Sequence, residues 1–214
     1  ESEEILGSYP CAPALFGPTS FEELIRSGGF YIEKTAFAPT EVDETGCAPI
    51  PDTPSHHDEL VDFVPTMIQE ACDPDAPDPS CTAQLHAIRV VRRGDCSFYA
   101  KAVHQRLRWA AAGMVVVSDH DSDLFVMSHS EDGELRLSPE EIPCSVLVNS
   151  RDGEDLLAKL EVDRDEDGAE VVVRISLTPQ AVSRPPHDGG GEVQWPIVAA
   201  QPNVLHIYSQ AGWG

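Results

Sequence analysis

One stretch of the sequence limits the possible folds more than any other: residues 85–117. Residues 85–91 are mostly apolar and contain no Gly or Pro, and Gly94 then predicts a turn. Ser97 can cap a helix that Gly113 closes, and residues 114–117 are again uniformly apolar. A strand, a crossover helix and a second buried strand form a βαβ unit, so we expect the two strands to be parallel and adjacent.

Weaker patterns surround this unit. The first 18 residues contain three prolines and predict a loop. Val171, Val173, Ile175 and Leu177 alternate with other residues, which predicts that they face one side of a strand. The remaining predicted elements are a short helix over 21–26, strands over 30–37 and 143–148, a short edge strand over 124–127, a helix over 152–160, and a strand or surface wrap over 195–208.

The length of 214 residues suits one domain with long loops. We assign residues 1–178 to this domain, with a core at 85–178 and an acidic, Pro-rich insertion at 48–82. For residues 179–214 we predict a Pro/Gly-rich linker followed by a C-terminal strand or extension.

The chain is strongly acidic, with 37 Asp and Glu against 14 Lys and Arg and a formal net charge of −23. This charge repels nucleic acid and anionic membrane surfaces, and it favours neutral or basic protein partners. The longest apolar run, Trp109 to Val117, is far shorter than the ~20 residues of a membrane span. We therefore expect neither nucleic-acid binding nor a membrane span in this chain.

The six cysteines are Cys11, Cys47, Cys72, Cys81, Cys96 and Cys144. The even number is compatible with three disulfides, but six cysteines allow about 15 pairings, so their connectivity stays open. Cys72 and Cys81 bracket a segment that is too rich in Pro and Asp for a helix or strand, and a bridge there would close a small loop. Zinc is the competing explanation, but no C-x-x-C pair occurs, so disulfides in an oxidising compartment are favoured.

A longer motif emerges when these segments are taken in order. A hydrophobic strand ends in Arg-Gly-x-Cys-x-Phe, a Lys-bearing helix ends in Ala-Gly, an aliphatic strand follows, and an Ile-Pro strand then precedes a Gly-containing helix. The residues concerned are Arg93, Gly94, Asp95, Cys96, Phe98, Lys101, Gly113, Ile142, Pro143 and Gly153. Over about 85–178 this order resembles the signature of protease-associated (PA) domains.

Two features depart from that family. Four extra residues, Arg106 to Trp109, lie between the Lys and the Ala-Gly pair. Four residues turn a helix by about 400°, so an extra turn rotates its buried face by only ~40°. The second departure is the insertion at 48–82, for which the family offers no function.

The resemblance implies an α/β fold of the PA type, a mixed, partly closed sheet or barrel with two main helices. It also implies a Cys47–Cys96 disulfide, which leaves Cys72–Cys81 and Cys11–Cys144 as the other pairs. The implied function is non-catalytic: binding proteins or positioning substrates within a larger secretory-pathway protein, without a cofactor. Residues 14–18, Ala-Leu-Phe-Gly-Pro, are similar to the entry of PA domains in mannosidase-like proteins of endoplasmic-reticulum degradation.

With such a parent, the implied location is the endoplasmic-reticulum lumen. The implied partners are misfolded glycoproteins, other domains of the parent chain and a disulfide isomerase. Transmembrane RING ubiquitin ligases, sorting receptors and peptidases are alternative parents. Any glycosidase or peptidase activity would then belong to another part of the parent protein.

Several short patterns have competing interpretations. Arg93-Gly94-Asp95 spells an integrin-type tripeptide, but a strand-to-helix turn explains it better. Asp163, Asp165 and Asp167 imitate the start of an EF-hand loop, yet the twelfth position is Arg174, so we favour a solvated acidic turn over a weak calcium site. Two other acidic and His-bearing loops, at 56–58 and 119–123, lack the His spacing of a zinc-enzyme helix.

No catalytic motif stands out. A G-x-S-x-G nucleophile elbow is absent, and we expect every Cys to take part in a disulfide. Arg108 and Trp109, in the extra helical turn, are residue types favoured at interfaces, although Trp109 also fits the core. An acidic-loop calcium-binding module is therefore the alternative to an interaction domain.

Overall fold

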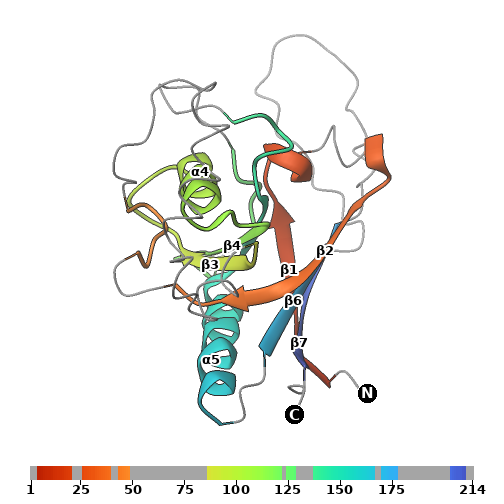
Figure 1. Ribbon diagram of the computed structural model, residues 1–214, viewed down its shortest axis with the longest axis vertical. Helices are drawn as coiled ribbons and strands as arrows, with labels where there is room; N and C mark the ends of the chain where they lie inside the picture. Colours follow the sequence, from red (N-terminus) through yellow and green to blue (C-terminus); the bar gives the residue numbers. More distant parts are fainter. Residues whose placement is uncertain are drawn as a thin grey trace, which may run out of the picture.

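The computed structural model describes residues 4–20, 26–39, 43–48, 86–121, 124–128, 137–166, 170–177 and 203–210 (Figure 1). Within these residues a mixed sheet closes into a barrel in the strand order β1-β5-β4-β3-β2-β6-β7. The elements are β1 (Glu4–Pro13), the 3-10 turn η1 (Gly17–Thr19), β2 (Phe30–Phe37), β3 (Ile88–Arg92), α4 (Phe98–Trp109), β4 (Gly113–Val117), β5 (Cys144–Val148), α5 (Ser150–Glu166), β6 (Glu170–Leu177) and β7 (Asn203–Gln210). An α/β fold with two main helices is confirmed for these residues.

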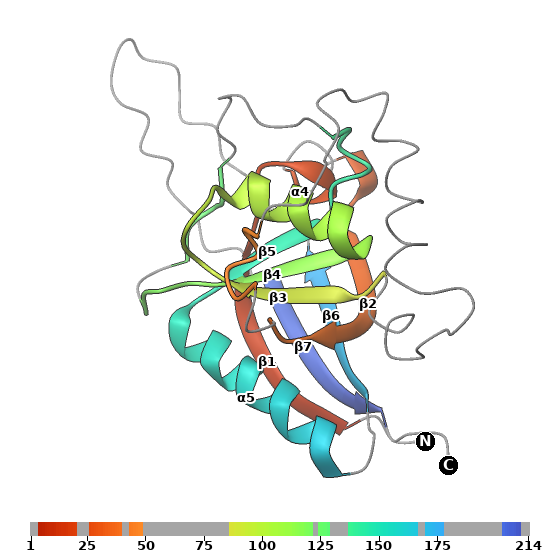
Figure 2. The same cartoon turned by 60° about the vertical axis from the view of Figure 1, so that its left-hand side comes forward.

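The parallel part of the barrel carries both helices. Strands β3, β4 and β5 run parallel, with Val90 opposite Val115 and Val115 opposite Val146. Helix α4 lies on one side of them and α5 on the other (Figure 2). The predicted βαβ unit is therefore confirmed: two buried strands connected by a crossover helix are parallel neighbours.

Strand β2 also runs parallel to β3, and the remaining pairings of the barrel are antiparallel. Strand β7 pairs with both β1 and β6, and β6 pairs with β2, so the N- and C-terminal strands complete the closure. The alternation along β6 is confirmed, because the four residues predicted to share one side all belong to the same buried cluster: Val171, Val173, Ile175 and Leu177.

Two apolar cores result. One joins the inward-facing residues of the strands to Leu156, Leu157 and Leu160 of α5. The other lies between the outer face of β3–β5 and α4, where Met114 and Val116 meet Leu107 and Val103. A buried parallel sheet needs cover on both faces: α4 covers the outer face, and the opposite barrel strands together with α5 cover the inner face.

Two predicted elements need correction here. The prediction of a loop at the N-terminus is wrong, because β1 forms a long antiparallel pair with β7 from Glu4↔Ser209 to Cys11↔Asn203. Pro10 lies where β1 is paired only with β7, and proline is tolerated where one side of a strand is unpaired. Segment 124–128 is not an edge strand: it makes a single parallel bridge, Ala14↔Met127.

The end of the crossover helix also differs from the prediction. Helix α4 stops at Trp109 because Ala110 adopts a left-handed conformation, φ 49°, and Gly113 instead begins β4. A Cβ at Gly113 would approach Ile88 Cγ1 to 2.9 Å, so this glycine permits the close pairing of β3 and β4.

Several predictions fall outside the described residues. These are the Cys72–Cys81 disulfide, the His56-His57-Asp58 loop, most of the insertion at 48–82, most of the helix over 21–26 and the linker after residue 178. Among the described residues, no helix has the length and apolar character needed to cross a membrane.

Candidate functional site

The turn between β3 and α4 gathers most of the motif residues. Gly94 has φ 127° and Asp95 has φ 62°, so two successive residues adopt conformations with positive φ that reverse the chain. Ser97 then caps α4, its hydroxyl accepting a hydrogen bond from Ala100 N at 3.1 Å. Local backbone structure therefore explains both residues: Gly94 allows the turn, and Ser97 caps the start of the helix.

A disulfide ties this turn to segment 43–48. Cys47 and Cys96 are bonded with a Cα–Cα distance of 5.9 Å, as the resemblance implied. Gly46 lets the segment approach β3, because a Cβ there would meet Val91 Cγ1 at 2.9 Å. The backbone bond from Arg92 N to Glu44 O, 2.9 Å, adds a second connection.

Lys101 lies beneath the disulfide and is fully buried. Its Nζ donates hydrogen bonds to Thr45 O at 2.6 Å and Gly94 O at 2.5 Å, and it lies 3.0 Å from Cys47 Sγ. Burial lowers the pKa of Lys101 to about 8, although the nearby carboxylates of Asp43 and Asp95 act in the opposite direction. One amine thus links the segment before the insertion to the turn before α4.

The two remaining cysteines within the described residues do not form a disulfide. Cys11 and Cys144 are both buried free thiols, so the predicted third disulfide is wrong. The pairing of β1 with β5 places Ala12 opposite Leu147 and Pro13 opposite Val146, so the two cysteines are offset along the strands instead of facing each other. Burial raises the pKa of the Cys11 thiol to about 12.

The carboxyl ends of the parallel strands form a polar edge beside this turn. Arg92 forms ion pairs with Glu44 and Glu154, and Arg93 pairs with Asp119 at 2.8 Å. Asp95, the last residue of the integrin-type tripeptide, accepts a hydrogen bond from Thr45 Oγ1 at 2.8 Å. These contacts integrate the tripeptide into the turn.

A shallow hollow of about 590 Å³ lies at the same edge, lined by Asp121, Asn149, Arg151, Asp152 and Asp155. Four of these five side chains, all except Arg151, make hydrogen bonds within the described part of the chain. Asp121 Oδ1 accepts from Arg151 N at 2.8 Å, and Asn149 Oδ1 accepts from Asp152 N at 2.7 Å, which caps the start of α5.

Asp155 also joins a contact between α5 and β1. The hydroxyl of Tyr9 donates to Asp155, and Lys159 Nζ donates to the Tyr9 hydroxyl at 2.7 Å. Burial and Asp155 raise the pKa of Tyr9. A phenol that is harder to deprotonate is not an activated base, so we interpret this trio as an anchor of α5 on β1.

The described residues contain no metal site. No group of three or more His, Cys, Asp or Glu side chains there could hold an ion. Asp163 and Asp165 lie within α5, which continues to Glu166, so the acidic turn predicted at 163–168 is wrong over these positions. A helical backbone cannot wrap its ligands around calcium as an EF-hand loop does.

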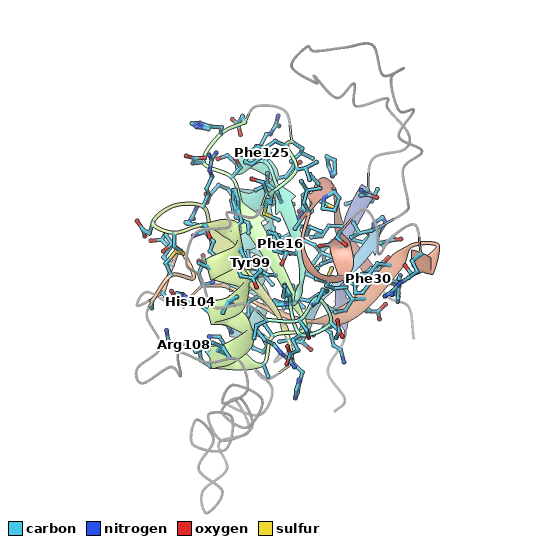
Figure 3. All side chains as sticks on the ribbon, turned by 90° about the horizontal axis from the view of Figure 1, so that it is seen from above. Phe16, Phe30, Tyr99, His104, Arg108 and Phe125 are labelled. Atoms are coloured by element: carbon cyan, nitrogen blue, oxygen red, sulfur yellow. A yellow bond between two sulfur atoms is a disulfide. The ribbon has the colours of Figure 1, made fainter. Side chains whose placement is uncertain are left out.

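The two predicted interaction residues contact their own chain. Arg108 Nη1 lies 3.5 Å from the Asp43 carboxylate, and the Trp109 ring stacks 4.6 Å from the guanidinium of Arg89. Figure 3 shows Arg108 and His104 on the side of α4 away from Phe16 and Tyr99. Through Arg89, Trp109 therefore takes part in the contact between α4 and the sheet.

A different surface carries exposed apolar side chains, and the sequence did not indicate it. Leu15 is 54% exposed and Val126 is 40% exposed. They are neighbours because Leu15 N donates to Met127 O at 2.9 Å. The rings of Phe98 and Phe125 are in tilted contact with centroids 5.8 Å apart, and the guanidinium of Arg93 lies 5.1 Å from the Phe125 ring. We call these four apolar residues the Leu15–Val126 surface: Leu15, Phe98, Phe125 and Val126.

Comparison with known proteins adds little. No protein-family model matches the chain, and no curated protein matches it. One similar solved structure is an aminopeptidase from Aneurinibacillus sp. strain AM-1, with 13% sequence identity and a TM-score of 0.33. The match covers 78% of this chain but only 40% of that protein. A likeness at this level carries no argument about activity.

Proposed function

We propose that this chain is a non-catalytic domain of the PA type that binds or positions other proteins within a larger secretory-pathway protein. The observation that supports this most is the junction around Lys101. There, residues from separate parts of the motif, the Cys47 segment, the Gly94–Cys96 turn and the Lys of α4, contact one another. These are the positions that the resemblance singled out from sequence alone.

The chemistry of the described residues agrees with a binding role. The carboxylates at the polar edge are held by ion pairs and helix caps, and no activated nucleophile accompanies them. A disulfide and buried thiols are compatible with a secreted or luminal protein. A mannosidase-like parent in the endoplasmic reticulum remains part of the proposal and depends on the resemblance of residues 14–18.

The Leu15–Val126 surface is the place where we expect a partner to bind. Exposed neighbouring apolar side chains next to an Arg stacked on aromatic rings resemble the composition of interface centres. The chain carries a formal net charge of −23, so a partner segment with apolar and basic residues is the one we expect.

Site-specific crosslinking tests the proposal. With a photo-crosslinking amino acid at Leu15, we expect discrete protein adducts from secretory-pathway lumen extract, and fewer adducts when Val126→Asp is added. The same crosslinker at Lys34, an exposed residue on β2, is the matched control. Equal adducts at both positions would contradict the assigned surface.

An activity screen tests the non-catalytic part. We expect the purified chain to leave peptide, ester and glycoside substrates intact. Hydrolysis that persists through purification and is lost with a single substitution at the polar edge, such as Asp152→Asn, would refute the proposed function.

A further inference from the structure

We propose that the Cys47–Cys96 disulfide is a site of thiol–disulfide exchange. A dithiol reductant attacks Cys96, and Cys47 leaves as a thiolate that Lys101 stabilises. This goes beyond the proposed function, because a binding domain needs only an inert crosslink. The proposal assigns the two sulfurs different chemical roles, and it rests on the unequal surroundings of those sulfurs.

The asymmetry begins with Lys101. Its Nζ lies 3.0 Å from Cys47 Sγ, and within the described part of the chain it makes no such contact with Cys96. Lys101 is 0% exposed, so the amine is fixed in place and shielded from solvent. An ammonium at hydrogen-bond distance stabilises a thiolate, and a stabilised thiolate is a better leaving group in exchange.

Two carbonyl oxygens near Cys47 act in the opposite direction. The carbonyl oxygens of Thr45 and Gly94 lie 3.6 Å and 3.4 Å from Cys47 Sγ, and carbonyl dipoles disfavour a thiolate. Lys101 Nζ donates to both of these oxygens, which offsets their effect. The carboxylates of Asp43 and Asp95 are the other charged groups that act on Lys101, and both favour its ammonium form.

The two cysteines are equally accessible, because both are partly exposed. Their difference is electrostatic: the carboxylate of Asp95, adjacent in the chain, disfavours a thiolate on Cys96. The contact of Lys101 with Cys47 favours departure of Cys47, which leaves Cys96 as the sulfur that is attacked.

The exchange is balanced as follows. A thiolate of the dithiol attacks Cys96 Sγ, a new S–S bond forms there, and the electron pair of the old bond leaves on Cys47 Sγ beside the Lys101 ammonium. The second thiol of the reductant then attacks the mixed disulfide and releases Cys96. The reductant is oxidised to its disulfide, and the protein disulfide is reduced to two thiols.

Reduction need not unfold this region. Segment 43–48 stays connected to β3 through the bond from Arg92 N to Glu44 O, and to α4 through Gln105 Nε2 and the Asp43 carboxylate at 3.3 Å. The two sulfurs can therefore remain close, and the exchange can reverse.

Trapping the intermediate in the wild-type chain tests the assignment. The chain is treated briefly with glutathione, quenched with acid, alkylated and mapped by mass spectrometry. We expect glutathione on Cys96 and an alkylated thiol on Cys47. Glutathione mainly on Cys47, equal labelling of both, or a bond that resists reduction until the chain unfolds would overturn the proposal.

Rates supply the second measurement. We expect dithiothreitol to reduce the Cys47–Cys96 bond of the Lys101→Met variant roughly tenfold more slowly than that of the wild type, because the leaving thiolate loses its cation. Lys34→Met makes the same chemical change at an exposed site and should leave the rate unchanged. A folded Lys101→Met variant that is reduced at the wild-type rate would refute the role of Lys101. If this variant does not fold, the mapping of the wild-type intermediate decides.

Discussion

At the scale of single residues, Gly153 shows how one position can control the contact between a helix and a strand. It lies in the first turn of α5, where a Cβ would come within 2.2 Å of Val117 Cγ1. Buried positions with so little space do not accept an added methyl group without movement of the backbone. The motif glycine is therefore explained by close packing of α5 on β4.

We predict that Gly153→Ala lowers the free energy of unfolding by about 1–3 kcal/mol through overpacking. Urea denaturation followed by circular dichroism measures the change. The control is Glu161→Ala, an exposed position on the same helix, which should stay within about 0.5 kcal/mol of the wild type. If both variants match the wild type, the contact with Val117 is not as close as described.

Lys101 provides a second test at this scale. Its folded pKa of about 8 is below the unfolded value of 10.5, so between these pH values the unfolded chain binds more protons than the native chain. The free energy of unfolding should therefore gain a contribution from Lys101 as pH rises from about 8 to about 10.5, and this contribution is absent below that window.

The measurement is the ¹³Cε chemical shift of Lys101 in the native chain as a function of pH. We expect its midpoint near pH 8, well below the 10.5 of an ordinary lysine. A midpoint near the ordinary lysine value would show that Lys101 is solvated in solution.

At the scale of elements, the turn between β3 and α4 depends on a crosslink to a distant segment. The disulfide closes a loop with a sequence separation of 49 residues. Such a loop has high conformational entropy in the unfolded chain, so the crosslink destabilises that state.

We predict that replacing both cysteines, Cys47→Ala with Cys96→Ala, lowers the free energy of unfolding by roughly 4 kcal/mol on the chain-entropy model. Denaturant titration measures the loss, and the corresponding double Ser variant should give the same value because the crosslink is what matters. Two variants that differ widely would instead point to side-chain packing, and no loss in either would contradict the crosslink.

At the scale of the whole molecule, charge is the dominant feature. The described cations are largely engaged, with Arg92, Arg93 and Arg174 each paired to a carboxylate. The formal net charge of −23 therefore leaves many carboxylates without a cation. Their mutual repulsion destabilises the compact state more than the expanded one.

We predict that sodium chloride raises the melting temperature steeply at low concentration and that the rise flattens once the screening length falls to about 5 Å, near 0.3–0.4 M. Differential scanning calorimetry across a salt series measures this. A purely linear rise would indicate a general salt effect on apolar burial, and no rise would mean that repulsion is unimportant.

The parallel strands could be predicted from sequence because each is mostly apolar and contains no proline, and a crossover helix between two such runs has one common handedness. Local chemistry likewise revealed the Gly94 turn and the Ser97 cap. Strand β1 could not be predicted, because its prolines and glycine signal a loop locally and its pairing with β7 joins residues almost 200 positions apart.

The sequence by itself therefore determined the βαβ core, its α/β class and its acidic surface, since these follow from local patterns and composition. Only the tertiary structure decided the barrel closure, the offset that keeps Cys11 and Cys144 apart, and the contact of Lys101 with Cys47. The physical reason is that strand register and side-chain proximity are set by pairing between distant segments, which no local pattern encodes.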